Sequence, residues 1–174
     1  TMKKINKKLN VIVADVCYDD NGLSTPVIPL GAGLVAAHAK AVNPDILVSV
    51  YKGITPLIDE IKKNPPDVIG LTNYVWNNNL AIRIANVAKK INPDVLIVFG
   101  GPEIDKSPAN KSIMNGKYNI ADFFIQYEGE LAFANLIKRY LELGLDKSKL
   151  KNEILKLGNC FIIENKKIIA GPNL

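Results

Sequence analysis

Short runs of apolar and β-branched residues alternate along this chain with longer stretches whose apolar residues recur every three or four positions. Runs of the first kind are typical of buried strands, and stretches of the second kind are typical of amphipathic helices. The predicted strands are Val11–Asp15, Ile46–Tyr51, Val68–Leu71, Val95–Phe99 and Asp122–Ile125, and the predicted helices are Leu30–Ala41, Thr55–Lys63, Asn78–Ile91 and Glu130–Leu143. This strict order predicts a parallel sheet with helices on both faces.

The C-terminal part of the chain departs from the alternation. Residues 146–156 have the pattern of a polar helix or linker, and the strand-like segments Cys160–Ile163 and Ile168–Ala170 flank a turn at Asn165. That arrangement is typical of a β-hairpin. We therefore expect an α/β domain over residues 1–145, with a flavodoxin-like or Rossmann-like doubly wound sheet of five parallel strands. A polar linker and a hairpin over residues 146–174 would follow it.

Composition excludes several classes of protein. Hydrophobic residues make up 48% of the 174 positions and charged residues 22%, which is enough for one sizeable core. The net charge of +5 comes mainly from lysines in residues 3–8 and 147–167, so it predicts a solvated surface rather than a nucleic-acid interface. No segment has the ~20 apolar residues of a membrane span. With only two cysteines, we expect a reduced, cytoplasmic protein that binds neither nucleic acid nor membrane.

The ends of the predicted strands carry the residues on which a function would depend. In an open α/β sheet, ligands bind beyond the carboxyl ends of the strands, where the strand order reverses. These ends read DVCYDDNG, LTNYVWNN, GGPEID and QYEGE after the first, third, fourth and fifth strands. None of them is a GxxxxGK[ST] phosphate loop, a GxGxxG loop or a GxSxG elbow. A nucleoside triphosphate, a dinucleotide and a serine nucleophile are therefore disfavoured.

Other residues that could carry chemistry have simpler explanations. The only histidine, His38, lies within a predicted helix, and we expect it to be structural. Glu103, Glu128 and Glu130 could form a carboxylate metal cluster. Equally, Glu128 and Glu130 could favour the start of the last long helix through its dipole, and we expect that role.

Two glycines at the end of the fourth predicted strand indicate that something approaches the backbone closely there. Gly100 and Gly101 follow the apolar run VLIVF, and glycine permits such an approach. The ligand would be large and mostly neutral, with a few hydrogen bonds and an aromatic wall. A corrinoid has that character.

Four segments, in this order and at these spacings, resemble the cobalamin-binding (B12-binding) N-terminal domain of radical S-adenosylmethionine enzymes. They are PLGAGLVAAHAKA, IGLTNYVWNNNL, VFGGPEI and ADFFIQYEGELAFANLIKRYL, and the closing hairpin CFIIENKKIIAGPNL extends the resemblance over nearly the whole chain.

The resemblance implies a cobalamin site at these strand ends. Thr72, Gly100 and Gly101 would line a slot for the dimethylbenzimidazole tail of the cofactor, threaded between the first and third strands. The loop residues that would pass under the corrin ring are Asn73, Tyr74, Val75, Trp76 and Asn77. Further contacts are expected from Pro102, Glu103, Tyr127, Glu128 and Gly129. The family's usual Gly-Glu-Gly-Glu has a tyrosine, Tyr127, in place of its first glycine here.

The lower face of cobalt would lack a histidine ligand. Cobalamin domains of the methionine synthase and mutase type carry Asp-x-His-x-x-Gly after the first strand, whereas this chain reads DVCYDD, with Cys17 in the histidine position. The resemblance therefore implies base-off cobalamin without a protein nitrogen ligand, with Trp76 filling the space below the ring.

The resemblance also implies a larger parent enzyme. That parent would be a methyltransferase whose radical domain, in the same polypeptide, binds a [4Fe-4S] cluster and S-adenosylmethionine. The cluster needs a CxxxCxxC motif, which this sequence does not contain. We therefore expect the chain to be one domain of a longer polypeptide, which binds cobalamin and catalyses nothing alone.

Two other classes of function stay open. A flavodoxin-like binding or signalling module without cobalamin would have the same sheet. A receiver of that kind would carry an acidic pair after the first strand, which Asp19 and Asp20 match in part, and a lysine where Tyr127 stands. A small α/β enzyme could use Glu103 and Glu128 as acid and base, but the sequence offers it no nucleophile.

Overall fold

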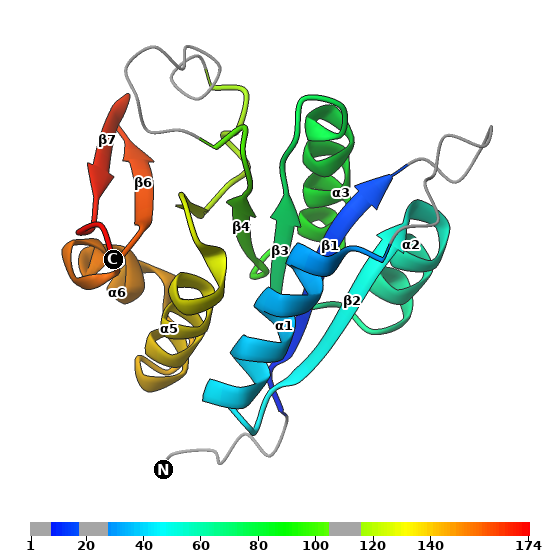
Figure 1. The fold of residues 1–174 in the computed structure, drawn as a ribbon, viewed down its shortest axis with the longest axis horizontal. Coiled ribbons are helices and arrows are strands. Elements are labelled where there is room, and N and C mark those ends of the chain that lie inside the picture. The colour runs from blue at the N-terminus through cyan, green and yellow to red at the C-terminus, as the bar shows by residue number, and fades with distance from the viewer. Residues whose placement is uncertain (1–7, 18–27, 105–115) are drawn as a thin grey trace.

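The computed structural model describes residues 8–17, 28–104 and 116–174, which form a seven-stranded sheet between layers of helices (Figure 1). The strand order is β2-β1-β3-β4-β5-β6-β7. The strands are β1 (Asn10–Cys17), β2 (Leu47–Gly53), β3 (Val68–Thr72), β4 (Leu96–Gly100), β5 (Phe123–Ile125), β6 (Cys160–Glu164) and β7 (Lys167–Ala170). Strands β1 to β5 are parallel, and β6 and β7 form an antiparallel hairpin that pairs with β5. The five parallel strands and the hairpin are confirmed, but they form one sheet.

Four long helices cover the two faces of the sheet. Helices α1 (Leu30–Val42) and α5 (Gly129–Glu142) pack on one face, and α2 (Ile54–Lys63) and α3 (Asn78–Ile91) pack on the other (Figure 1). The short helices α6 (Lys147–Asn152) and η1 (Ile154–Lys156) connect α5 to β6. The predicted doubly wound α/β fold is therefore confirmed.

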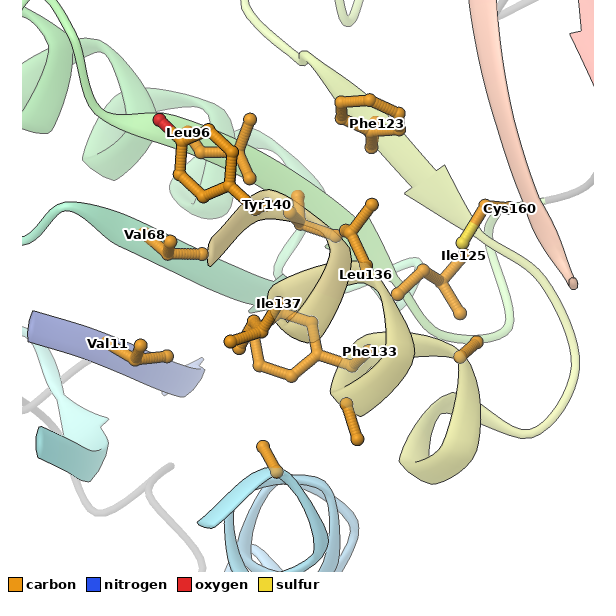
Figure 2. Packing of buried hydrophobic residues seen from close by; sticks show 14 of the residues in the cluster. Val11, Val68, Leu96, Phe123, Ile125, Phe133, Leu136, Ile137, Tyr140 and Cys160 are labelled. Atoms are coloured by element: carbon orange, nitrogen blue, oxygen red, sulfur yellow. The ribbon is translucent and has the colours of Figure 1, made fainter. Parts of the chain in front are cut away.

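Alternation along the strands divides the core into two halves. In β1, Val11 and Val13 face α1 and α5, whereas Ile12 and Ala14 face α2 and α3. Figure 2 shows the first half, where Phe133 and other α5 side chains pack over the strands. Each fully buried Val, Ile or Phe contributes about 1.5–3 kcal/mol through burial of apolar surface. The period of two along the strands thus specifies which face each residue covers.

The point where the strand order reverses lies between β1 and β3. Strand β1 has β2 on one side and β3 on the other, so the connections that follow β1 and β3 run to opposite sides. Such a divergence leaves a crevice at the carboxyl edge of an open sheet. The N-terminal turns of α1 and α5 lie at this edge, because each helix follows the end of a strand.

Candidate functional site

A pocket of about 310 Å³ opens at the carboxyl edge of the sheet, between the first turns of α1 and α5. Its floor and walls come from four parallel strands and two helices. The contributing residues are Val13, Gly70, Leu71, Thr72, Val98, Gly100 and Ile125 from the strands, Gly31, Ala32 and Val35 from α1, and Gly129, Glu130 and Phe133 from α5. Tyr74, Gly101, Tyr127 and Glu128 from the loops complete the lining. The interior is mostly apolar.

The pocket lies over the sheet, not between two of its strands. Strands β1 and β3 are hydrogen-bonded neighbours, paired from Val11 with Val68 to Ala14 with Leu71. No slot passes between the two strands over these paired residues, and the position of the tail stays a prediction. The space is instead on the α1 and α5 face of the sheet, above β3 and β4.

Two glycines keep the pocket open. A β-carbon added at Gly31 would meet nothing within 4 Å outside its own turn of helix, and one at Gly100 would lie 3.7 Å from the carbonyl oxygen of Ile125, an ordinary contact. Both residues line the pocket. A side chain at either position would therefore take up pocket volume without clashing with the protein.

Gly101 has a different role from the one predicted. Its φ is +105°, and a β-carbon there would lie 2.8 Å from the backbone nitrogen and oxygen of Asn73. The turn after β4 is held against that residue, because the Glu103 amide donates to the Asn73 carbonyl at 3.1 Å. Gly101 is thus required by the protein's own backbone, so its missing side chain is explained without a bound ligand.

A third glycine, Gly70, lets an aromatic ring form the inner wall. A β-carbon at Gly70 would lie 3.1 Å from a ring carbon of Phe133. Phe133 is 2% exposed and points from α5 into the buried cluster under the sheet (Figure 2). The glycine within the strand therefore allows α5 to bring this ring close to the sheet.

A hydrogen-bonded network joins the ends of β1 and β3 beside the pocket. The Thr72 hydroxyl donates to Asp15 Oδ1 at 2.7 Å, and the Asn77 amide donates to the same oxygen at 3.3 Å and to the Val16 carbonyl at 3.1 Å. Asn77 Oδ1 accepts from the Tyr74 amide at 2.8 Å. Asn77 is 2% exposed, so it holds the loop rather than facing a ligand.

The loop held by Asn77 presents apolar side chains to solvent. Val75 is 70% exposed and Trp76 is 73% exposed. The rings of Tyr74 and Trp76 stack with centroids 4.7 Å apart and an angle of 9° between their planes. An exposed apolar group of this kind beside a pocket is typical of a contact surface.

Tyr127 adopts a backbone conformation that favours glycine. Its φ is 64°, and its side chain, 64% exposed, stands at the mouth of the pocket. A non-glycine residue in this left-handed region costs about 1 kcal/mol. The chain therefore makes this turn with a tyrosine in a conformation that glycine adopts more readily.

The structure brings seven of the thirteen predicted contacts together at the pocket. These are Thr72, Tyr74, Gly100, Gly101, Tyr127, Glu128 and Gly129. The others lie beside it. Asn73 is fully buried behind the turn after β4, Val75 and Trp76 are on the exposed loop, Asn77 is internal, and Pro102 and Glu103 follow that turn.

Glu103 does not line the pocket. Burial raises the pKa of the Tyr118 phenol, the Glu103 carboxylate raises it further, and a hydrogen bond with the Asn73 side chain lowers it. Tyr118 belongs to the core half formed by α2 and α3. Glu128 lines the pocket and Glu103 does not, so the two do not form a shared acid and base site there.

Ten lining residues of the pocket were not among the predicted contacts, and Gly31, Val35 and Phe133 are three of them. Gly31 and Val35 are one helical turn apart and therefore share a face of α1. A signal for Gly31 was present in the small residues of LGAGL at the start of the helix. Phe133 carried no signal, because only tertiary packing brings it over Gly70.

Within residues 8–17, 28–104 and 116–174, no group of three His, Cys, Asp or Glu side chains is placed to hold a metal ion. The Cys17 thiol contacts the Lys52 carbonyl oxygen at 3.6 Å. None of the helices described here combines the length and the apolar content needed to cross a membrane.

Together, the doubly wound sheet and the glycine-lined pocket at its carboxyl edge define an α/β domain of the cofactor-binding class. The B12 binding domain family matches residues 23–137, and the chain belongs to this family. The resemblance predicted from the four sequence segments is thereby confirmed.

Two curated relatives are methyltransferases. The chain is 31% identical over 119 residues to the cobalamin-dependent radical SAM methyltransferase TokK of Streptomyces tokunonensis, over 64% of this chain. It is 29% identical over 120 residues to the 2-(S-pantetheinyl)-carbapenam-3-carboxylate methyltransferase of Streptantibioticus cattleyicolor, over 66% of this chain. The chain spans only 17% of the length of each relative.

A solved structure has the same fold. The cobalamin-dependent S-adenosylmethionine radical enzyme OxsB, with aqua-cobalamin and S-adenosylmethionine bound, matches with a TM-score of 0.70 and 17% sequence identity. The match covers 95% of this chain and 22% of OxsB.

Proposed function

We propose that this chain binds cobalamin at the carboxyl edge of its sheet, with the nucleotide tail in the pocket between α1 and α5. The observation that carries the proposal is the glycine-lined pocket itself. Gly31 and Gly100 leave space that any side chain would fill, at the point of the sheet where this class of domain binds ligands. The family match gives the chemical identity of the ligand.

The residues present fit that cofactor. A pocket of about 310 Å³ with apolar walls suits a flat heterocycle and its sugar. The hydroxyl of Thr72 and the partly exposed carboxylates of Glu128 and Glu130 are at hand for hydrogen bonds at the mouth. The exposed ring of Trp76, stacked on the half-buried ring of Tyr74, offers an apolar surface on which a corrin ring can rest.

For the lower face of cobalt, we propose that no protein nitrogen is a ligand and that the cofactor is base-off. Cys17 stands where related domains carry histidine, and its sulfur contacts a backbone oxygen. Trp76 would cover the lower face by apolar contact, on a loop held in place by Asn77 and Asp15. Bound in this way, cobalamin supplies a methyl carrier whose cobalt has no competing axial base.

We further propose that the parent protein is a cobalamin-dependent radical SAM methyltransferase in the cytoplasm. The names of the two curated relatives support this reaction class. The [4Fe-4S] cluster and S-adenosylmethionine would bind to a radical domain of the same polypeptide, after the polar linker and hairpin of residues 146–174. The role of this chain would be to hold the corrinoid.

Retention of hydroxocobalamin through a desalting column tests the binding proposal. We expect the corrinoid to leave the column with the folded protein. Trp76 is the only tryptophan of the chain, so quenching of its fluorescence by the corrin ring reports binding at this loop directly. If all the corrinoid separates from a folded protein and the fluorescence does not change, the chain is a flavodoxin-like module without cobalamin.

Electron paramagnetic resonance of the cobalt(II) form tests the lower face. We expect cobalt lines without nitrogen splitting, and signs of water ligation when Trp76→Ala removes the ring. Three-line splitting in the unaltered protein would show an axial nitrogen and contradict the base-off assignment, while leaving cobalamin binding intact.

A further inference from the structure

The walls of the pocket differ sharply in polarity between its depth and its mouth. Val13, Val98 and Phe133 in the depth are each at most 3% exposed and carry no polar side-chain atom. Ala32 and Val35 extend the same apolar surface along α1. The carboxylates that line the pocket, Glu128 and Glu130, belong to residues that are partly or fully exposed at the first turn of α5. Polar partners are therefore available to a ligand mainly at the mouth.

Thr72 cannot supply a donor to the pocket. Its hydroxyl proton is directed to Asp15 Oδ1, 2.7 Å away, so only the oxygen lone pairs remain. A hydroxyl has one proton to donate. The backbone of β3 and β4 offers little more, because these strands pair with each other from Val68 with Leu96 to Thr72 with Gly100.

We infer that this pocket selects corrinoids by their lower base, preferring a benzimidazole to a purine. The inference rests on the proposed function, and it extends that proposal from a cofactor class to one chemical form of the cofactor. Dimethylbenzimidazole presents methyl groups and ring carbons to the walls. Adenine, which has similar size and shape, presents an exocyclic amine and further ring nitrogens.

The physical reason is the loss of hydrogen bonds to water. In the apolar depth, the amine and ring nitrogens of adenine would leave water without gaining partners, which is costly for buried polar groups. The two methyl groups of dimethylbenzimidazole would gain contact with Val13, Val98 and Phe133 instead. We expect adeninyl cobamide to bind roughly 10- to 100-fold more weakly than cobalamin.

Val35→Thr changes the polarity of one wall at nearly constant volume. Its hydroxyl can bond to a carbonyl of the preceding helical turn when no ligand is present, which protects the fold. With adenine in the pocket, the hydroxyl gives the base a partner. Val42→Thr is the matched control, because Val42 lies on the same helix at its other end, is 37% exposed and does not line the pocket.

The experiment is a titration of the chain with three corrinoids, in which quenching of Trp76 fluorescence measures binding. The corrinoids are cobalamin, adeninyl cobamide and cobinamide, which lacks the tail. Because all three contain the same ring, the readout is the same for each. We expect cobalamin to bind most tightly. We expect Val35→Thr to reduce the ratio of the affinity for cobalamin to the affinity for adeninyl cobamide roughly threefold to tenfold, and Val42→Thr to leave this ratio unchanged. Detaching a base from cobalt costs the same energy whichever protein then binds the corrinoid. This energy therefore cancels when the affinity ratio of the variant is compared with that of the unaltered chain.

Each other outcome overturns a defined part of the account. If cobalamin and adeninyl cobamide bind equally, more tightly than cobinamide, and Val35→Thr changes nothing, the base selectivity is wrong and the proposed function stands. If all three bind equally, the tail lies outside the pocket, and both the selectivity and the tail position are wrong. If none binds, the proposed function itself is wrong, and the selectivity with it.

Discussion

The two edges of the parallel sheet differ in how their polar groups are paired. We call them the beginning edge, where the strands start, and the ending edge, where the strands end. At the edge where the strands begin, Asp122 Oδ2 accepts from the Ile97 amide at 2.9 Å and lies 3.3 Å from Lys89 Nζ and 3.5 Å from Lys147 Nζ. At the edge where the strands end, Val75 and Trp76 are more than two-thirds exposed. At the beginning edge, polar groups bond to one another within the protein. At the ending edge, apolar side chains are exposed and a pocket is open.

This difference indicates that the beginning edge contributes mainly to the stability of the domain and the ending edge mainly to ligand binding. The beginning edge is held by side chains that reach across strands, as when the Asn10 amide donates to Asp67 Oδ2 at 2.8 Å. At the ending edge, the network of Asp15, Thr72 and Asn77 supports the loop below the proposed ring position. Changes at the first edge should therefore alter folding, and changes that fill the pocket should alter binding.

The largest expected effect on the free energy of unfolding comes from a substitution at Gly101. This residue lies at the ending edge, but the backbone of the protein itself requires a glycine there. Gly101→Val introduces a branched side chain at φ +105°, with its β-carbon 2.8 Å from the Asn73 backbone. We expect it to lower the free energy of unfolding by at least about 3 kcal/mol, measured by urea denaturation. Gly100→Val is the control and should stay folded while losing cobalamin. Equal stability of the two variants would show that the turn after β4 is not constrained as described.

A smaller effect is expected at the beginning edge. Asp122→Ala removes a carboxylate that accepts from the Ile97 amide and pairs with three lysines, Lys89, Lys147 and Lys151; its side chain is 12% exposed. We expect a loss of about 2 kcal/mol in the free energy of unfolding, because buried partners are left unpaired. The affinity of the folded variant for cobalamin should not change. A large loss of affinity would mean that the two edges are coupled.

A further prediction at the same edge is a dependence of stability on pH that originates at Lys147. Burial lowers the pKa of this ammonium to about 8, with Lys89 also lowering it and Asp122 opposing the shift. The unfolded chain has a lysine pKa of about 10.4. Between these values the unfolded state binds more protons, so this group makes stability rise as pH increases from 8 towards about 10.

Lys147→Met isolates that contribution. The variant cannot titrate at this position, so the rise that Lys147 causes should disappear from urea midpoints measured across the same pH range. Tyrosines that titrate near the upper end are common to both proteins and cancel in the comparison. An identical pH profile for the two proteins would contradict the assignment to Lys147.

The regular part of the fold was predictable because it depends on local patterns. The helix over Asn78–Ile91 was predicted with the bounds that the structure gives it, and the continuous apolar run of Val11, Ile12 and Val13 marked a strand, which the structure buries on both faces. These features follow from the periods of 3.6 and 2 residues, which the sequence displays directly.

The site was predictable only in part, because distant segments form it. A strand-end glycine can serve a ligand or a neighbouring backbone, and the contact of Gly101 with Asn73 shows that the second applies. Asn77 could have faced a ring, but its side chain bonds to Asp15 and Val16 instead. The packing of Phe133 over Gly70 involves residues 63 positions apart, so no local pattern could reveal it.

The claim that the pocket holds the cofactor is tested most directly at two glycines of α1. Gly31 lines the pocket, Gly33 does not, and a β-carbon at either would meet nothing within 4 Å outside its own helix. Leucine at either position favours the helix by up to about 1 kcal/mol, so both variants should fold. We predict that Gly31→Leu weakens cobalamin binding at least about tenfold, since each 1.4 kcal/mol is a factor of ten, and that Gly33→Leu binds as the unaltered chain does. Equal affinity of the two variants, with both folded, would contradict the account.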